Sequence, residues 1–146
     1  MTAFWRYLLL TLGLAGALAV AFGVIYLAAL RHSGLDLSRS KATAAGVFVV
    51  SIAPESAVVQ QGQAQNWLLT LKTAAGAPVE NAAIDVSGGM PQTNQALPTS
   101  PQVTDYLGSG RYLVQGVKFS QPGWWQLRVG ISAAAGSDTV VFNIVL

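Results

Sequence analysis

The side chains that most often catalyse reactions or bind metals are few in this chain and lie far apart. Histidine occurs once, as His32, and cysteine is absent. The six Asp and Glu residues are spread singly between Asp36 and Asp138, with no Gly-rich phosphate loop and no Ser-His-acid arrangement among them. The absence of cysteine excludes disulfides, thiolate metal centres and Cys nucleophiles. We therefore expect no enzyme activity, no cofactor, no metal site and no small-molecule substrate.

The charge distribution does not indicate a nucleic-acid partner. Through Ala45 there are four Lys and Arg residues and one Asp, a net +3, whereas four basic and five acidic residues from Gly46 onward give −1. A nucleic-acid footprint needs basic residues clustered on the folded domain. The excess of positive charge lies instead beside an apolar segment, as is typical of Lys and Arg residues that meet lipid headgroups.

That apolar segment runs from Tyr7 to Leu30, 24 residues without a charge or a proline. As a helix it would be about 36 Å long, enough to cross a hydrocarbon core of about 30 Å. A cleaved signal peptide is the alternative, because Ala17-Leu18-Ala19 has a cleavage-site pattern, but a signal h-region has only about 7–15 residues. We predict a transmembrane anchor over 1–31, a polar connector over 32–45 and a folded domain over 46–146, with a lipid bilayer as one partner.

Small side chains gather on one side of the predicted helix. Gly13, Ala17 and Ala21 would let another helix approach closely, so we predict them as contacts with subunits of an integral membrane protein complex. The alternative is that Ala and Gly are simply common in membrane helices. The positive charges that follow the span do not favour export of the C-terminal domain.

After the connector the pattern becomes that of β-strands. Apolar residues alternate with polar ones in runs separated by Gly- and Pro-rich turns, as in half-buried strands. The pattern predicts an all-β fold, an immunoglobulin-like antiparallel β-sandwich of about seven strands. Tyr112, directly after the turn Gly108-Ser109-Gly110, is expected to form a tyrosine corner. The clearest runs are 47–52, 67–72, 82–86, 112–119, 125–131 and 140–146.

Three residues of this domain are candidate partner contacts. Met90 and Pro91 lie in the stretch 88–102, which contains three prolines and no charge and is expected to be an irregular loop. Trp124 is expected to point outward if Trp125 points into the core. The alternatives are a plain crossover between sheets for the loop and a rim position for Trp124.

Several short motifs follow one another in a fixed order through the domain. They are Gly76-Ala77-Pro78-Val79-Glu80-Asn81-Ala82, Gly89-Met90-Pro91, Leu97-Pro98-Thr99-Ser100-Pro101-Gln102-Val103-Thr104, Leu107-Gly108-Ser109-Gly110-Arg111-Tyr112, Gly116-Val117-Lys118-Phe119, Pro122-Gly123-Trp124-Trp125 and Asp138-Thr139-Val140-Val141-Phe142. With these motifs the chain from about Val47 onward resembles the FixH/YtkA-like family. The resemblance implies a bacterial inner-membrane protein with one N-terminal helix and a periplasmic β-sandwich. It also implies a link, through FixH (also called CcoH), to the assembly, stability and copper supply of cbb-type haem–copper oxidases.

The departures from the family pattern argue against a metal role. In many relatives Met-Pro is followed by His-containing residues and the later Pro-Gly is preceded by Met, whereas this chain has Gln92-Thr93-Asn94-Gln95 and Gln121 there. Copper prefers thioether and imidazole ligands to amides, so we do not carry the metal role over.

These observations lead to two functional hypotheses. The first is a non-catalytic, single-span accessory subunit of a bacterial bioenergetic membrane complex, a respiratory oxidase by resemblance, with photosynthetic or other electron-transfer complexes also open. The alternative is a copper-delivery or oxidase assembly factor. A subunit should copurify stoichiometrically with its complex, whereas a carrier should bind Cu(I) by itself.

Overall fold

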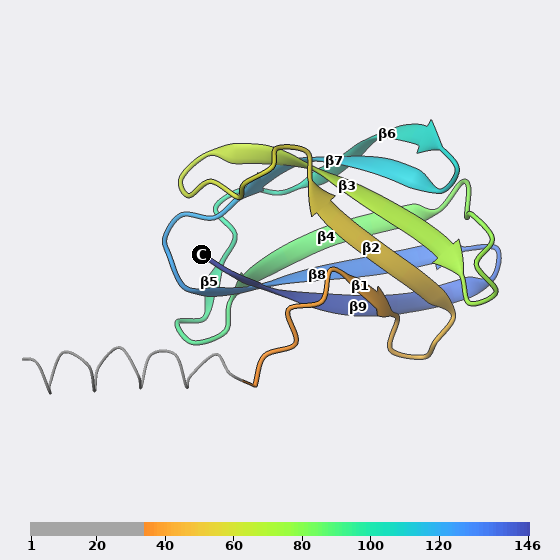
Figure 1. Ribbon diagram of the computed structural model, residues 1–146, viewed down its shortest axis with the longest axis horizontal. Helices are drawn as coiled ribbons and strands as arrows, with labels where there is room; N and C mark the ends of the chain where they lie inside the picture. Colours follow the sequence, from red (N-terminus) through yellow and green to blue (C-terminus); the bar gives the residue numbers. More distant parts are fainter. Residues whose placement is uncertain (1–33) are drawn as a thin grey trace, which may run out of the picture. The chain divides into compact units, whose positions relative to one another are not determined.

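The computed structural model describes residues 34–146, which form two antiparallel β-sheets packed face to face (Figure 1). The first sheet has the strand order β1-β2-β3-β7-β6 and the second the order β5-β4-β8-β9. The strands are β1 (Ser40–Ala42), β2 (Phe48–Pro54), β3 (Ala64–Thr73), β4 (Ala83–Met90), β5 (Gln95–Ala96), β6 (Gln102–Gly108), β7 (Arg111–Lys118), β8 (Trp124–Ala133) and β9 (Gly136–Val145). The prediction of an all-β antiparallel sandwich is confirmed.

The predicted membrane anchor lies outside the described residues, and so do Gly13, Ala17 and Ala21. Within residues 34–146 there is no helix long and apolar enough to cross a membrane.

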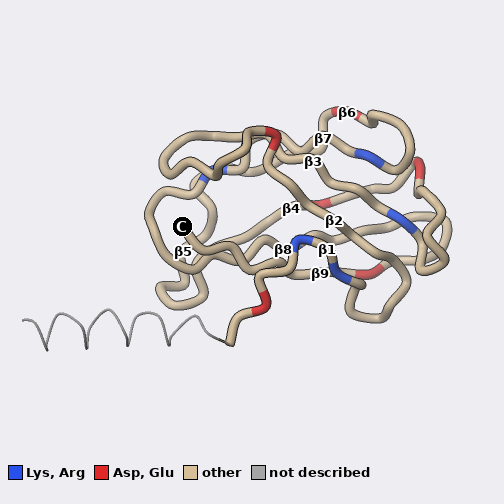
Figure 2. The backbone as a smooth tube through the Cα atoms, viewed as in Figure 1, with Lys and Arg blue, Asp and Glu red and all other residues tan. Residues whose placement is uncertain are grey.

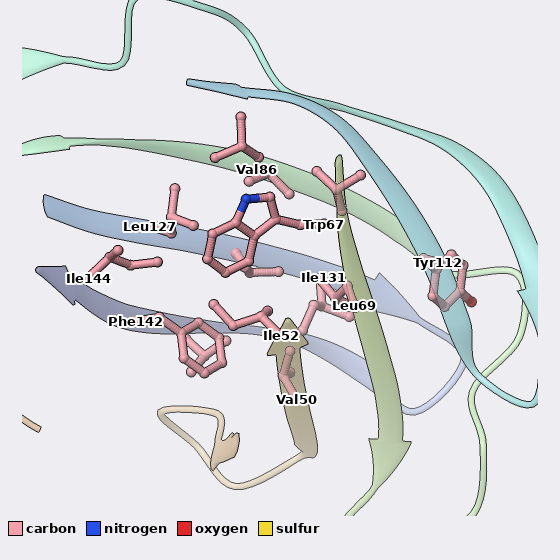
Figure 3. Packing of buried hydrophobic residues seen from close by; sticks show 14 of the residues in the cluster. Val50, Ile52, Trp67, Leu69, Val86, Tyr112, Leu127, Ile131, Phe142 and Ile144 are labelled. Carbon is pink, nitrogen blue, oxygen red and sulfur yellow. The ribbon is translucent and has the colours of Figure 1, made fainter. Parts of the chain in front are cut away.

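The core lies between the two sheets and follows from the alternation of the sequence. Trp67 and Leu69 of one sheet point toward Leu127 and Phe142 of the other (Figure 3). Trp125 is fully buried, as predicted, with its ring centroid 5.4 Å from that of Phe119. Each large apolar side chain buried in this way contributes about 1.5–3 kcal/mol, so the central strands stabilise the fold.

The sandwich has nine strands rather than about seven. Six of them correspond to the runs listed from the sequence, and the other three, β1, β5 and β6, match none of those runs. All three lie at the edge of a sheet. An edge strand buries few side chains and needs little apolar alternation, which explains why the pattern gave no sign of them. In β6, for example, every residue except Val103 and Gly108 is exposed.

The stretch 88–102, expected to be an irregular loop, contains six strand residues among its fifteen. Its first three residues complete β4, Gln95–Ala96 form β5 against β4, and Gln102 begins β6. The irregular part therefore consists of the turn 91–94 and the connection 97–101. The hairpin could not be predicted because β5 is only two residues long, which is too short to show an alternating pattern. The glycines and prolines around it favoured a loop instead.

The segment predicted as a connector over 32–45 joins the sandwich from Asp36 onward. β1 pairs with β2, and two basic side chains, that of Arg39 just before β1 and that of Lys41 within it, reach the free edge of β9 in the other sheet. Arg39 Nη1 donates to the carbonyl oxygen of Asn143 at 2.7 Å, and Lys41 Nζ donates to that of Val141 at 3.2 Å. Charged side chains that point into an edge in this way prevent it from pairing with another strand.

Tyr112 is buried and structural, as expected, but its geometry differs from a tyrosine corner. Its hydroxyl donates to the carbonyl oxygen of Val79 at 2.8 Å and accepts from the backbone N–H of Ala82 at 3.2 Å. The partners lie about 30 residues upstream, in the β3–β4 connection, rather than within the preceding corner. Tyr112 therefore holds the chain where it passes from the first sheet to the second.

Candidate functional site

The β4–β5 hairpin places the first two candidate residues in different environments. Met90 ends β4 with only 5% of its surface exposed and belongs to the hydrophobic core. Pro91, the next residue, begins the turn and is exposed. Of the two predicted contacts in this stretch, Pro91 is therefore on the surface and Met90 is not.

Met90 is fixed by the loop that precedes β8. Gln121 Nε2 lies 3.0 Å from Met90 Sδ and also donates to Gln95 Oε1 at 2.9 Å. Gly123 has a φ of +129°, and a Cβ at this position would lie 2.9 Å from Met90 Cε. Trp125 Nε1 donates to the carbonyl oxygen of Gln121 at 3.0 Å. Hairpin and loop are therefore packed together at this end of the sandwich.

The side chains around Met90 do not fit a copper site. They offer one buried thioether and the amides of Gln95 and Gln121, and an amide N–H already points at the sulfur. Copper prefers thioether and imidazole ligands. In the described part of the chain there is no group of three or more His, Asp and Glu residues that could hold a metal.

A hollow of about 350 Å³ lies beside the hairpin, on the outer face of the second sheet. Its charged side chain is that of the exposed Arg128, which has no ion-pair partner within residues 34–146. Few charges lie at this end of the sandwich, around β5 and the C-terminus (Figure 2). The hollow is lined by Ser87, Gly88, Gly89, Met90, Pro91, Asn94, Gln95, Ala96, Gln126, Arg128 and Val141.

Trp124, the third candidate residue, is half-buried at the start of β8. Its Nε1 donates to Asn143 Oδ1 at 3.0 Å, an oxygen that also accepts from Gln126 Nε2 at 3.2 Å. Asn143 Nδ2 in turn donates to the carbonyl oxygen of Asp36 at 3.0 Å. Asn143 thus joins Trp124 to the first residue of the sandwich. The sequence pattern gave no signal for this role, because Asn143 is one polar residue in an alternating strand.

Comparison with known proteins identifies the family. Residues 42–130 match the YtkA-like family. The chain belongs to the YtkA-like family. The sandwich also resembles the crystal structure of a DUF4426-family protein from Pseudomonas aeruginosa, with a TM-score of 0.55 and 19% identity over 75% of this chain and 96% of that chain. No curated protein matches the chain.

The YtkA-like match covers the candidate hairpin and Trp124 but not the edge on which the chain enters. It begins at the end of β1 and stops within β8. Asp36, Asn143 and the whole of β9 lie outside it.

Proposed function

We propose that this YtkA-like protein is a non-catalytic, single-span accessory subunit of a bacterial bioenergetic membrane complex, with its sandwich on the periplasmic side. Family membership favours a respiratory oxidase as the complex, and photosynthetic or other electron-transfer complexes remain alternatives. The predicted helix packs in the membrane, and the sandwich caps the extramembrane surface of the complex.

The observation that carries this proposal is the attachment of Asp36 to β9. The carbonyl oxygen of Asp36 is bound by Asn143, and Lys41 Nζ lies 2.8 Å from its carboxylate, which holds the pKa of Asp36 well below its usual range. Asp36 follows Leu30, the end of the predicted span, by six residues, a reach of at most about 20 Å. Such a short tether suits a domain that works at the membrane surface rather than one that ranges through the periplasm.

The β4–β5 hairpin and the adjacent hollow supply the docking surface. The turn 91–94 is exposed and uncharged, and Arg128 is the cation beside it. Interfaces between proteins are depleted of charge at their centre and often contain Arg. The order β2-β3-β7-β6 opposite β4-β8-β9 supports an immunoglobulin-type sandwich, whose loops at one end commonly bind partners.

Affinity purification of the tagged full chain in mild detergent tests the proposal. A subunit is expected to bring down a stoichiometric set of membrane proteins with a defined haem spectrum. Replacing the turn 91–94 by Gly and Ser, with Met90 and Gln95 kept, should lower the occupancy of the chain. The matched control changes Ala74 and Ala75 to Ser in the exposed turn after β3. Purification of the chain alone would contradict the proposal.

The alternative, a copper-delivery or assembly factor, rests on family membership and requires ligands that the Met90 region lacks. Titration of the full chain with Cu(I) against a competing chelator separates the two functions. We expect no binding tighter than that of the variant Met90→Leu. Tight, Met90-dependent binding by a chain that is absent from the mature complex would favour the carrier.

A further inference from the structure

Three apolar side chains lie at the end of the sandwich where the chain enters it. Trp124 begins β8 and is paired across the strands with Val145 near the end of β9. Val145 is 37% exposed, and Leu37, which follows Asp36 directly, is 46% exposed. We call these three residues, Leu37, Trp124 and Val145, the Trp124 patch.

The polar end of Trp124 is already satisfied within the protein. Its Nε1 donates to Asn143 Oδ1, and the same Asn143 binds Asp36 on its other side. The hydrogen bond fixes the indole against β9. The partly exposed ring then has no polar group that still needs a hydrogen-bond partner. The part of Trp124 that faces outward is therefore aromatic ring, and Trp rings are enriched at the level of the lipid headgroups.

The chain itself determines which surface lies close to this patch. Asp36, which is bound to the same Asn143 as Trp124, is at most about 20 Å of extended chain from the predicted end of the span at Leu30. The headgroup region adds about 5–8 Å on each side of the hydrocarbon core, so the bilayer interface is within reach of the patch. Nearby charge does not oppose contact, because Lys41 pairs with Asp36 and Arg39 adds a positive charge.

We propose that the Trp124 patch rests on the phospholipid headgroup region of the bilayer that holds the chain's own anchor. This inference rests on the proposed function through the predicted span, and it assigns Trp124 to lipid rather than to a protein subunit. The hairpin turn 91–94 is then the part of the domain that is left for the protein partner.

Tryptophan quenching in vesicles tests the contact without any other protein. The full chain is reconstituted in phosphatidylcholine vesicles whose acyl chains are brominated near the headgroup. In a Trp5→Phe background three indoles remain, and those of Trp67 and Trp125 are 2% and 0% exposed. We expect lipid bromine to quench the fluorescence of one of the three indoles, that of Trp124. The further change Trp124→Phe should abolish this quenching.

A second readout does not depend on replacing Trp124. The chain has no cysteine, so Val145→Cys can carry a single spin label. We expect the label to be accessible to lipid-soluble oxygen and protected from a water-soluble nickel complex. Ala75→Cys, in the exposed turn at the opposite end of the sandwich, is the matched control and should show the reverse.

The outcomes separate this inference from the proposed function. If Trp5 of the parent chain is quenched by lipid but Trp124 is not, or if the Val145 label is accessible from water, the patch does not contact lipid and the inference is overturned alone. Protection of Trp124 only when a complex is present assigns the patch to protein and also overturns it. If Trp5 is not quenched, the predicted span is not inserted, and both proposals fail.

Discussion

Tyr112 connects the two sheets of the sandwich through one hydroxyl group. Tyr112→Phe leaves the buried carbonyl of Val79 and the N–H of Ala82 without this partner. We expect a loss of about 1–3 kcal/mol in the free energy of unfolding, because unpaired buried polar groups cost that much. The measurement is denaturant unfolding of the full chain in mild detergent.

Tyr106→Phe is the matched control. The Tyr106 hydroxyl accepts only from the N–H of Gly110, and its side chain is 40% exposed. Water can replace part of that bond, so the loss should stay below about 1 kcal/mol. Equal losses in the two variants would contradict the role assigned to Tyr112.

Asp138 makes the stability of the sandwich depend on acid pH. Hydrogen bonds from the Thr43 hydroxyl and from the backbone amides of Thr139, Ala45 and Val47 lower the pKa of Asp138 to about 2. A carboxyl whose pKa is lower in the folded state contributes stability above its unfolded pKa of about 3.9 and loses it as the pH falls toward the folded value. Between about pH 4 and pH 2 the wild type should therefore lose more stability than Asp138→Asn.

The pH comparison needs a variant that removes a charge without those bonds. Asp105→Asn on the exposed strand β6 serves this purpose and should retain the acid-dependent loss of the wild type. Thermal unfolding at a series of pH values measures both variants. If the unfolding temperatures of Asp138→Asn and the wild type changed in parallel with pH, the hydrogen bonds between the loop 43–47 and this carboxylate would not stabilise the fold.

Strands β4 and β8 approach so closely that one glycine cannot be replaced. A Cβ at Gly88 of β4 would overlap the carbonyl oxygen of Gln126 on β8, which is backbone and cannot rotate away. We expect Gly88→Ala to destabilise the chain by about 1–3 kcal/mol through overpacking. It should also displace β5, because the N–H of Leu97 donates to the carbonyl oxygen of Gly88.

Gly130→Ala on β8 is the control for Gly88→Ala. It lies in the same sheet, has no positive φ, and its Cβ would meet only Asp85 Cβ at an ordinary 3.9 Å. Denaturant unfolding should show a change of less than about 0.5 kcal/mol. A comparable loss would mean that glycine is needed in this sheet for its backbone freedom and not for the close approach.

The strands that could be predicted from the sequence are those that build the core. In β2, β3, β8 and β9, alternate residues fill the space between the sheets, so burial itself produced the pattern. The edge strands β1, β5 and β6 bury little and left no such pattern. The local sequence therefore predicts the strands that line the core better than the strands at the edges of the sheets.

The candidate site was predictable only where it depends on alternation. The outward position of Trp124 followed from the burial of Trp125. The burial of Met90 did not, because it depends on Gln121 and Gly123, more than 30 residues away. The bond between Asn143 and Asp36 joins residues 107 positions apart. No periodicity or motif marks contacts of that kind, so they become visible only in three dimensions.

At the scale of the whole molecule, the entry of the chain at Asp36 would, with the proposed span, limit how far the sandwich can lie from the membrane. Residues 36–45, which had been predicted as part of a connector, are attached to β2 and β9. The predicted connector of 14 residues is therefore shortened to residues 32–35. If the proposed function holds, so short a tether would raise the effective concentration of the hairpin at the surface of the complex without any additional contact.

Lengthening this tether should weaken attachment even though no contact residue changes. Effective concentration falls as about the −3/2 power of linker length, so an insertion of about eight Gly and Ser residues between Gly34 and Leu35 should weaken retention about three- to fourfold. Occupancy after detergent purification is the measurement, and the same insertion between Ala75 and Gly76, in an exposed turn, is the control. Undiminished occupancy with the longer tether would mean that contacts within the membrane are sufficient to retain the chain. The sandwich would then contribute nothing to its attachment to the complex.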